Sequence, residues 1–490
     1  MEGHQHHLRR GFNWLGGATI IAKITDFATI LLVLRFLTKE QLGAASLVVA
    51  IGAVIEALDG LGTSTALVQA PSLSRLQLDS LFWLILVAAC VVAGVVLLAA
   101  PWIASLYGIA GVAAYFLAIA VKQPLVGAAV IPLAMLQRGL QYERIALVNV
   151  GSTFAAALTR LGLAMAGAGA WAIVIAFAAS GLFTLMGATL ASPFRPRLRI
   201  SLPAVSPLLR FGLRATMSGL CEQMINNIHH VLVGWFYGAA ALAEFRVGFD
   251  LAMEPANAAG TLINRTALPV FAKVAAIREH LVHSLTWSLR RLLAVLAPLA
   301  AAIVLAADPI TSMIHDEQHR SYAPASLPLK LLAAAALLRV ISQLAYPVWF
   351  ASGQPHLAVR FSGLTLLLLG AGMVLVGFTV PAANGLVAMS TVWLVVPPLL
   401  LLWQARYLHR HWGVRFHDLL RALGKPIVAV AMLVLAVVAL RRLIGINSPA
   451  LQVAVIGTLA LLTCLGLLLL EPSQRDRAAR ATGDQATIGE

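Results

Sequence analysis

The chain has 490 residues, of which 60% are hydrophobic and only 11% are charged, and its formal net charge is +15. Soluble domains carry about 25% charged residues, so this composition excludes a soluble globular protein. The basic residues are scattered in small groups between apolar stretches rather than gathered in one patch with interleaved aromatics, which argues against nucleic acid as a partner.

Fourteen apolar segments of about 20 residues, without the strict alternation of barrel strands, predict transmembrane helices. They lie near residues 13–37, 42–67, 80–104, 112–135, 145–167, 169–191, 211–236, 240–268, 292–307, 328–350, 357–379, 382–405, 426–444 and 449–470. The first is long and charged and has no cleavage site after it, so we expect a transmembrane helix rather than a signal peptide. Residues 276–291 predict a short basic amphipathic helix at the cytoplasmic interface.

The placement of Lys and Arg sets the orientation, because cytoplasmic loops carry an excess of both. With the N-terminus inside, 23 of the 35 basic residues fall on the cytoplasmic side. The outside holds Lys39, Arg320, Arg441 and Arg442. This asymmetry predicts a multi-pass protein of the bacterial inner membrane with both termini in the cytoplasm.

Fifteen ionisable side chains fall within or at the ends of the predicted spans, where a charge costs at least about 2.5 kcal/mol and therefore marks an interior or a hydrated cavity. They are Lys23, Asp26, Arg35, Glu56, Asp59, Lys122, Arg160, Glu222, Glu244, Arg246, Asp250, Glu254, Arg265, Lys330 and Arg339. Counted by helix, they occupy helices 1, 2, 4 and 5 and then 7, 8 and 10. This period of six predicts two pseudo-symmetric six-helix lobes around a central polar cavity, followed by two apolar helices.

Two interpretations of these charges remain open. Lys23 with Asp26, or Arg246 with Asp250, could neutralise each other within one helix. The carboxylate pairs, Glu56 with Asp59 and Asp250 with Glu254, are either coupling sites that carry a proton or cation, or partners of a basic residue on a neighbouring helix.

Other motifs give weaker signals. Cys90, Cys221 and Cys464 lie in apolar segments without paired spacing and are expected to be small buried residues. His315, Asp316 and His319 could bind a metal in an outer loop, but nothing fixes a geometry. The chain has no phosphate-binding GxxxxGK[ST] motif, and no cofactor is predicted.

Five stretches resemble the bacterial polysaccharide transporter family, the lipid-linked oligosaccharide repeat-unit flippases of the multidrug/oligosaccharidyl-lipid/polysaccharide flippase superfamily. They are RFLTKEQLGAASLVVA from Arg35, LQRGLQYERIALV from Leu136, RLGLAMAGAGAWAIV from Arg160, FRPRLRI from Phe194, and EFRVGFDLAMEPANAAGTLINRTALPVFAKV from Glu244. The resemblance covers about residues 10 to 410 and reaches the last two helices by count alone.

The resemblance implies an N-terminal six-helix lobe over residues 1–200 and a C-terminal lobe over 201–407. Transmembrane helices 13 and 14 would follow over 408–470, and a disordered cytoplasmic tail over 471–490. It also implies movement of undecaprenyl-diphosphate-linked oligosaccharides to the periplasmic leaflet, for lipopolysaccharide or exopolysaccharide synthesis. A diphosphate needs cationic partners, and Lys23, Lys122, Arg265 and Arg339 could supply them.

The implied partners are the lipid-linked glycan, membrane lipids, a polysaccharide polymerase and a chain-length regulator. One alternative is a drug or metabolite cation antiporter on the same fold, which would favour an acidic cavity; the buried set here is eight basic to seven acidic residues. Another is a membrane enzyme such as a polymerase or ligase, which typically needs a large periplasmic loop. The longest outer loop predicted here runs only from about Asp308 to Leu327, so we expect a transporter and not an enzyme.

Overall fold

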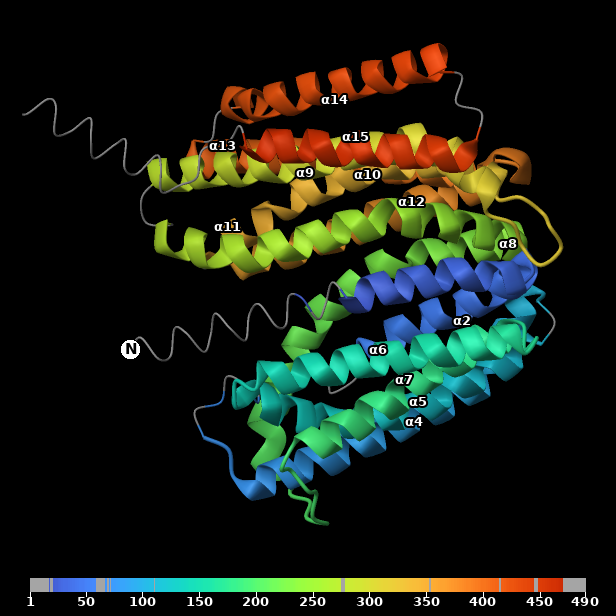
Figure 1. The fold of residues 1–490 in the computed structure, drawn as a ribbon. Helices are drawn as coiled ribbons and strands as arrows, with labels where there is room; N and C mark the ends of the chain where they lie inside the picture. Colours follow the sequence, from blue (N-terminus) through green and yellow to red (C-terminus); the bar gives the residue numbers. More distant parts are fainter. Residues whose placement is uncertain are drawn as a thin grey trace, which may run out of the picture. The chain divides into compact units, whose positions relative to one another are not determined.

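The computed structural model describes residues 17, 21–58, 67, 70, 72–109, 111–274, 278–351, 354–413, 416–444 and 448–469, which are almost entirely helical (Figure 1). After helical residues 21–33 come η1 (Leu34–Phe36), α2 (Lys39–Glu56), α4 (Arg75–Tyr107), α5 (Val112–Arg138), α6 (Tyr142–Met165), α7 (Ala170–Ala191), α8 (Leu202–Val274), α9 (Arg278–Met313), η3 (Ala323–Ala325), α10 (Ser326–Gln343), α11 (Ala345–Ala351), α12 (Pro355–Thr379), α13 (Ala382–Trp412), α14 (Phe416–Ile444) and α15 (Pro449–Leu469). The predicted tail from Glu471 lies outside the described residues.

The number of helices agrees with the sequence. Within the described residues, 11 helical segments are long and apolar enough to cross a membrane, and the one at Gly219–Ala258 overlaps two predicted spans. The first two predicted spans are described in part, as helical residues 21–33 and as α2. The prediction of an all-helical membrane protein with about fourteen spans is therefore confirmed.

A single glycine divides α8. Gly238 has φ 83° and ψ 179°, a conformation outside the helical region that glycine adopts far more readily than other residues. The break falls between the predicted spans 211–236 and 240–268, so α8 consists of two helices with little connecting chain.

Helix α9 differs from the prediction. It runs without interruption from Arg278 to Met313, so the predicted interfacial helix at 276–291 is, over its described residues, the first half of a long helix. Nothing between Arg291 and Leu292 breaks the backbone hydrogen bonds, because a change from an amphipathic to an apolar pattern does not itself end a helix. The prediction of a separate short helix was therefore wrong.

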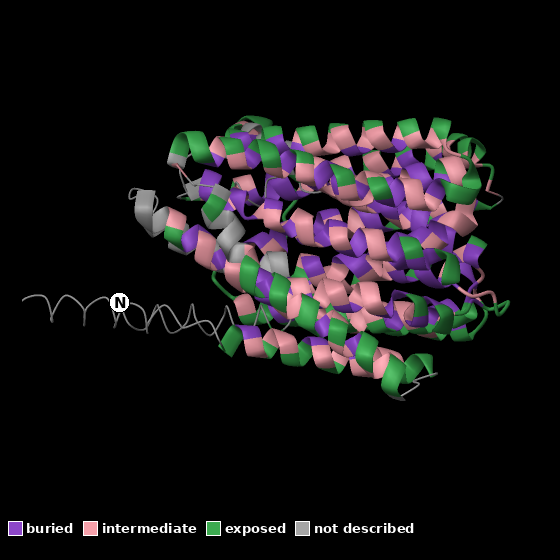
Figure 2. Ribbon diagram, turned by 90° about the horizontal axis from the view of Figure 1, so that it is seen from above, coloured by how far each residue is buried: buried purple, intermediate pink, exposed green. Residues whose placement is uncertain are grey.

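The first of two compact units comprises residues 1–247, 314–322 and 359–392. Here α4 packs on α5, α6 packs on α7, and α7 also packs on α5. Small residues allow these helices to approach closely: a Cβ at Gly127 of α5 would lie 2.9 Å from the Ala89 Cβ of α4. The purple residues of Figure 2 mark such buried surfaces.

The second unit comprises residues 248–313, 323–358 and 393–490. Its centre is α9, which packs against α10, α14 and α15. The hydrophobic contacts of α9 with the last two helices are made by Ala302, Ala306, Leu433, Val437, Ile456 and Ala460. The thirteenth and fourteenth predicted spans, which are α14 and α15, thus pack on α9. The domain boundaries at residues 200 and 407 stay predictions.

The outward faces of the helices are apolar. On α4, Val87, Val91, Val95, Leu98 and Trp102 are exposed at intervals of three or four residues, which places them on one side of the helix. Such a stripe would be a liability in water and is what a lipid-facing surface requires.

Candidate functional site

Lys122 of α5 lies in the interior of the first unit beside one of the predicted carboxylates. Its Nζ is 2.5 Å from Glu56 Oε1 and 3.4 Å from the centroid of the Phe177 ring. Gly181 makes room for it, because a Cβ there would come within 2.8 Å of Lys122 Cγ. The buried ammonium thus has an anion and an aromatic face as partners.

A second ion pair joins α6 to the first helix. Arg160 Nη2 is 2.6 Å from Asp26 Oδ1 and also donates to Thr29 Oγ1 at 3.3 Å. Asp26 therefore has a basic partner from another helix, Arg160. Lys23 itself is exposed on the same helical segment.

The first turns of α8 after Gly238 contact α2 within the first unit. Arg246 Nη1 donates to the buried Ser46 Oγ of α2 at 2.6 Å. One turn earlier, the backbones of α2 and α8 touch, because a Cβ at Gly43 would lie 1.8 Å from the Ala239 carbonyl oxygen. His229 and His230 are buried, and the ring centroids of His229 and Phe245 lie 5.7 Å apart.

The contact at Gly43 gives a direct test of this packing. Gly43→Ala should destabilise the protein by about 1–3 kcal/mol, since backbone atoms cannot rotate out of the way as a side chain can. Gly151→Ala in α6 is the matched control, because no atom lies within 4 Å of the added Cβ. Folded yield and melting temperature in detergent measure both, and equal values for the two variants would contradict the contact.

In the second unit, the predicted site residues lie on α8 and α10. Asp250 and Glu254 are half-buried and one turn apart on α8. The guanidinium of Arg339 lies 5.4 Å from the ring centroid of Trp393, which in turn contacts Phe249. The side chain of Arg265 and all of Asp59 lie outside the described part of the chain. Among the predicted site residues, the structure therefore joins Lys122 to Glu56.

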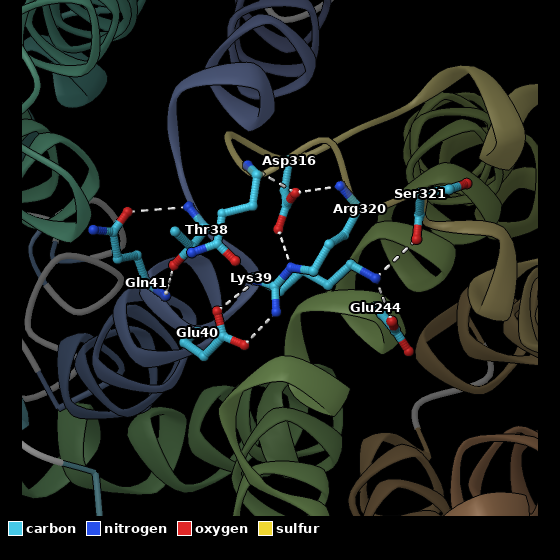
Figure 3. A network of polar contacts seen from close by, with 9 residues as sticks. Thr38, Lys39, Glu40, Gln41, Glu244, Asp316, Arg320 and Ser321 are labelled. Atoms are coloured by element: carbon cyan, nitrogen blue, oxygen red, sulfur yellow. Dashed lines mark hydrogen bonds and ion pairs between the residues drawn. The ribbon is translucent and has the colours of Figure 1, made fainter.

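A polar network that the sequence analysis did not assemble lies at the predicted outer end of the first unit (Figure 3). We call it the outer network: Thr38, Lys39, Glu40, Gln41, Glu244, Asp316, Arg320 and Ser321. The start of α2 is fixed by a capping box, in which Thr38 Oγ1 accepts from the Gln41 N–H and the Gln41 side chain accepts from the Thr38 N–H. This box places Lys39 and Glu40 in the first turn.

Lys39 and Asp316 are the buried members of the outer network. The Lys39 Nζ donates to Glu244 Oε1 at 2.6 Å and to the Ser321 carbonyl at 2.8 Å, and it lies 5.0 Å from the Tyr322 ring centroid. The contact joins the start of α2 to α8 and to the segment between α9 and η3. The buried ammonium therefore has a carboxylate, a backbone carbonyl and an aromatic ring as partners.

Arg320 forms the second half of the outer network. Its two terminal nitrogens donate to the Glu40 carboxylate at 2.8 and 2.6 Å, and its Nε donates to Asp316 Oδ2 at 2.8 Å. The bonds from Arg320 hold the pKa of Glu40 at about 2, well below its usual value. Asp316 Oδ1 accepts the backbone N–H groups of Gln318 and Arg320, so this carboxylate, considered above as a metal ligand, shapes the loop instead.

The fold is shared with solved structures of two membrane transporters. A structure of the lipid II flippase MurJ in an inward closed conformation matches with a TM-score of 0.74 at 12% identity, over 93% of this chain and 98% of that chain. An inward-facing multidrug resistance transporter of the MATE family matches with a TM-score of 0.61 at 15% identity, over 79% of this chain and 95% of that chain.

Residues 32–324 match the family described as polysaccharide biosynthesis protein, and the chain belongs to that family. The lipopolysaccharide biosynthesis protein WzxC of Escherichia coli (strain K12) is 22% identical over 72% of this chain and 71% of its own length. The succinoglycan biosynthesis transport protein ExoT of Rhizobium meliloti (strain 1021) is 24% identical over 60% of this chain and 59% of its own. The teichuronic acid biosynthesis protein TuaB of Bacillus subtilis (strain 168) is 26% identical over 36% of each.

Proposed function

We propose that this protein is a flippase that moves undecaprenyl-diphosphate-linked oligosaccharide repeat units from the cytoplasmic to the periplasmic leaflet for surface polysaccharide synthesis. The family match over residues 32–324 is the observation that carries this proposal. Relatives named for lipopolysaccharide and succinoglycan synthesis, and a fold shared with a lipid II flippase, support it.

The basic residues at membrane depth give the proposal its chemistry. A diphosphate leaving water needs cations to replace its hydration. We assign this role to Lys23, Lys122, Arg265 and Arg339. The structure describes the contacts of Lys122 directly: its ammonium pairs with the Glu56 carboxylate and lies over the Phe177 ring. The incoming diphosphate would then compete with Glu56 for the ammonium.

The carboxylates Glu56, Asp59, Asp250 and Glu254 remain candidates for coupling transport to a proton or cation gradient. The contact of Glu56 with Lys122 gives that carboxylate a neutralising partner from a neighbouring helix, which is the alternative weighed for it above. A carboxylate released by its lysine when substrate binds would be free to take up a proton, so the two roles are compatible.

We also propose the inner membrane as the location, with both termini cytoplasmic, since the basic residues are so unevenly divided between the two sides. The lipid-linked repeat units that a flippase moves to the periplasmic leaflet are the substrate for polymerisation there. A polysaccharide polymerase and a chain-length regulator are therefore the expected partners.

A deletion strain tests the function. Loss of this gene should abolish the surface polysaccharide and leave lipid-linked repeat units on the cytoplasmic leaflet. Intact polysaccharide together with new sensitivity to cationic drugs would instead identify the antiporter.

In that strain, Lys23→Ala, Arg265→Ala and Arg339→Ala should each fail to restore the polysaccharide at normal membrane levels, because each removes a cation that the diphosphate needs. Arg360→Ala, which removes an exposed arginine, is the control and should restore it. Full rescue by all three variants would show that these cations do not bind the substrate.

A further inference from the structure

Residues 192–201, which connect α7 to α8, form an ordered segment tied to the first turns of α4. Phe194 anchors the segment in the hydrophobic cluster around Leu78, Leu81 and Phe82. The Arg75 guanidinium covers the Phe194 ring at 4.8 Å. One aromatic side chain therefore fixes the start of the connection on α4.

The backbone beyond Phe194 is held by polar side chains of α4. The fully buried Asp79 accepts the Arg197 N–H at 3.1 Å, and Trp83 Nε1 donates to the Arg197 carbonyl at 2.9 Å. Ser80 Oγ accepts the Ser201 N–H at 2.9 Å. With these bonds made to α4, the backbone is fixed and the side chains of residues 197–200 are directed outward.

Those side chains make an unusual surface of alternating charge and hydrocarbon. Leu198 is 82% exposed and Ile200 is 62% exposed, while Arg197 and Arg199 between and beside them are exposed as well. Neither of these guanidinium groups forms an ion pair within the described residues. Asp79, the carboxylate that contacts the segment, is already engaged with the Arg197 N–H and with Arg75.

In the chain, this surface follows an exposed apolar side of α7. Leu182, Met186 and Leu190 are exposed at intervals of four residues and lead along the helix to the start of the segment. Leu198 and Ile200 follow this exposed stripe in the chain, just beyond the end of α7. Long arginine side chains at the end of a transmembrane helix extend towards the phosphate level of a bilayer.

We infer that the connecting segment 192–201 is a docking site for the headgroups of anionic phospholipids in the leaflet at this end of the protein. Arg197 and Arg199 bind the phosphates, and Leu198 and Ile200 enter the boundary between headgroups and acyl chains. Because the backbone is already fixed, binding requires little further ordering of the chain. The inference concerns membrane lipids and does not depend on the identity of the transported glycan.

A polarity-sensitive fluorophore on Leu198→Cys tests the inference in the full-length protein, with Cys90, Cys221 and Cys464 changed to serine. Phosphatidylglycerol titrated into non-ionic detergent micelles should shift the emission to the blue, and phosphatidylcholine should not. Arg197→Gln with Arg199→Gln should raise the midpoint of the titration by about tenfold or more, since each basic residue near an anionic surface contributes substantially to its attraction. Arg360→Gln with Arg406→Gln removes two other exposed arginines as the matched control and should leave the midpoint unchanged.

Three results would overturn the inference. Equal shifts with both lipids would show contact with hydrocarbon alone. Equal midpoints for the two double variants would show a general charge effect. A shift that appears with undecaprenyl diphosphate in phosphatidylcholine and is missing with phosphatidylglycerol would assign the segment to the transported lipid.

Discussion

Lys122→Met is expected to lower the folded yield sharply, because it leaves the partly buried Glu56 carboxylate without its ammonium partner. Breaking a buried ion pair by removing one member typically costs about 3–5 kcal/mol, a large part of the total stability of most proteins. Lys122→Met combined with Glu56→Gln removes both charges and should restore the yield to near the original level. Size-exclusion chromatography of the detergent-solubilised protein measures both results.

Transport by the double variant then separates structure from function. If Lys122 binds the diphosphate, the well-folded double variant still fails to export polysaccharide. Arg160→Met with Asp26→Asn removes another ion pair of the first unit and is the control for loss of a pair as such. Normal export by the Lys122 double variant would show that this ion pair only holds α5 to α2, and a yield that stays low would show that Lys122 has packing roles beyond its charge.

The number and order of the helices could be predicted because the thickness of a membrane fixes how long an apolar segment must be. The break at Gly238 was predictable for a similar local reason, since it falls between two complete spans. The predicted ends of the helices differ from the observed ones where a charged turn is part of the helix. The first turn of α2 begins at Lys39 rather than near residue 42, because the capping box of Thr38 and Gln41 extends the helix into a charged segment.

The partners of the charged residues could not be predicted from spacing along the chain. Asp26 pairs with Arg160, which lies 134 residues further along the chain and on a different helix. Which faces of two helices meet depends on their rotation about their axes, and this is set by the packing of many small residues. The buried Asp79 was missed for a related reason, since its partner is a backbone N–H of a connecting segment that folds back on α4.

The outer network leads to the second expected result with a large effect. If the network keeps the predicted outer end closed, Lys39→Met should open it far more than Glu40→Gln does. The Lys39–Glu244 pair has side-chain exposures of 8% and 15%, against 38% and 52% for Arg320 and Glu40. Exposed pairs contribute about 0–1 kcal/mol, whereas stranding a buried carboxylate costs about 3–5 kcal/mol.

A cost that falls on the closed state alone shifts the equilibrium between closed and open states. About 3 kcal/mol changes that ratio by more than a hundredfold, and less than 1 kcal/mol changes it by about fivefold at most. Ser46→Cys reports the change, because Ser46 is fully buried on α2 facing Arg246. Its reaction with a water-soluble thiol reagent should be slow with the outer network intact, fast with Lys39→Met, and nearly unchanged with Glu40→Gln.

The response to pH follows from the pKa of Glu40. Its folded-state pKa of about 2 lies below the ordinary value of 4.5, so the stabilisation from Arg320 is complete above pH 4.5 and is lost only as the pH falls towards 2. The labelling rate of Ser46→Cys, divided at each pH by the rate of the unfolded protein so that the fall in thiolate fraction cancels, should therefore be the same at pH 7.5 and pH 5.5. This pair cannot sense a proton gradient in that range. Lys330→Met, which breaks the exposed pair with Asp308 in the second unit, is the control and should leave labelling unchanged. Slow labelling in Lys39→Met, or equal rates in Lys39→Met and Glu40→Gln, would show that the outer network does not hold this end closed.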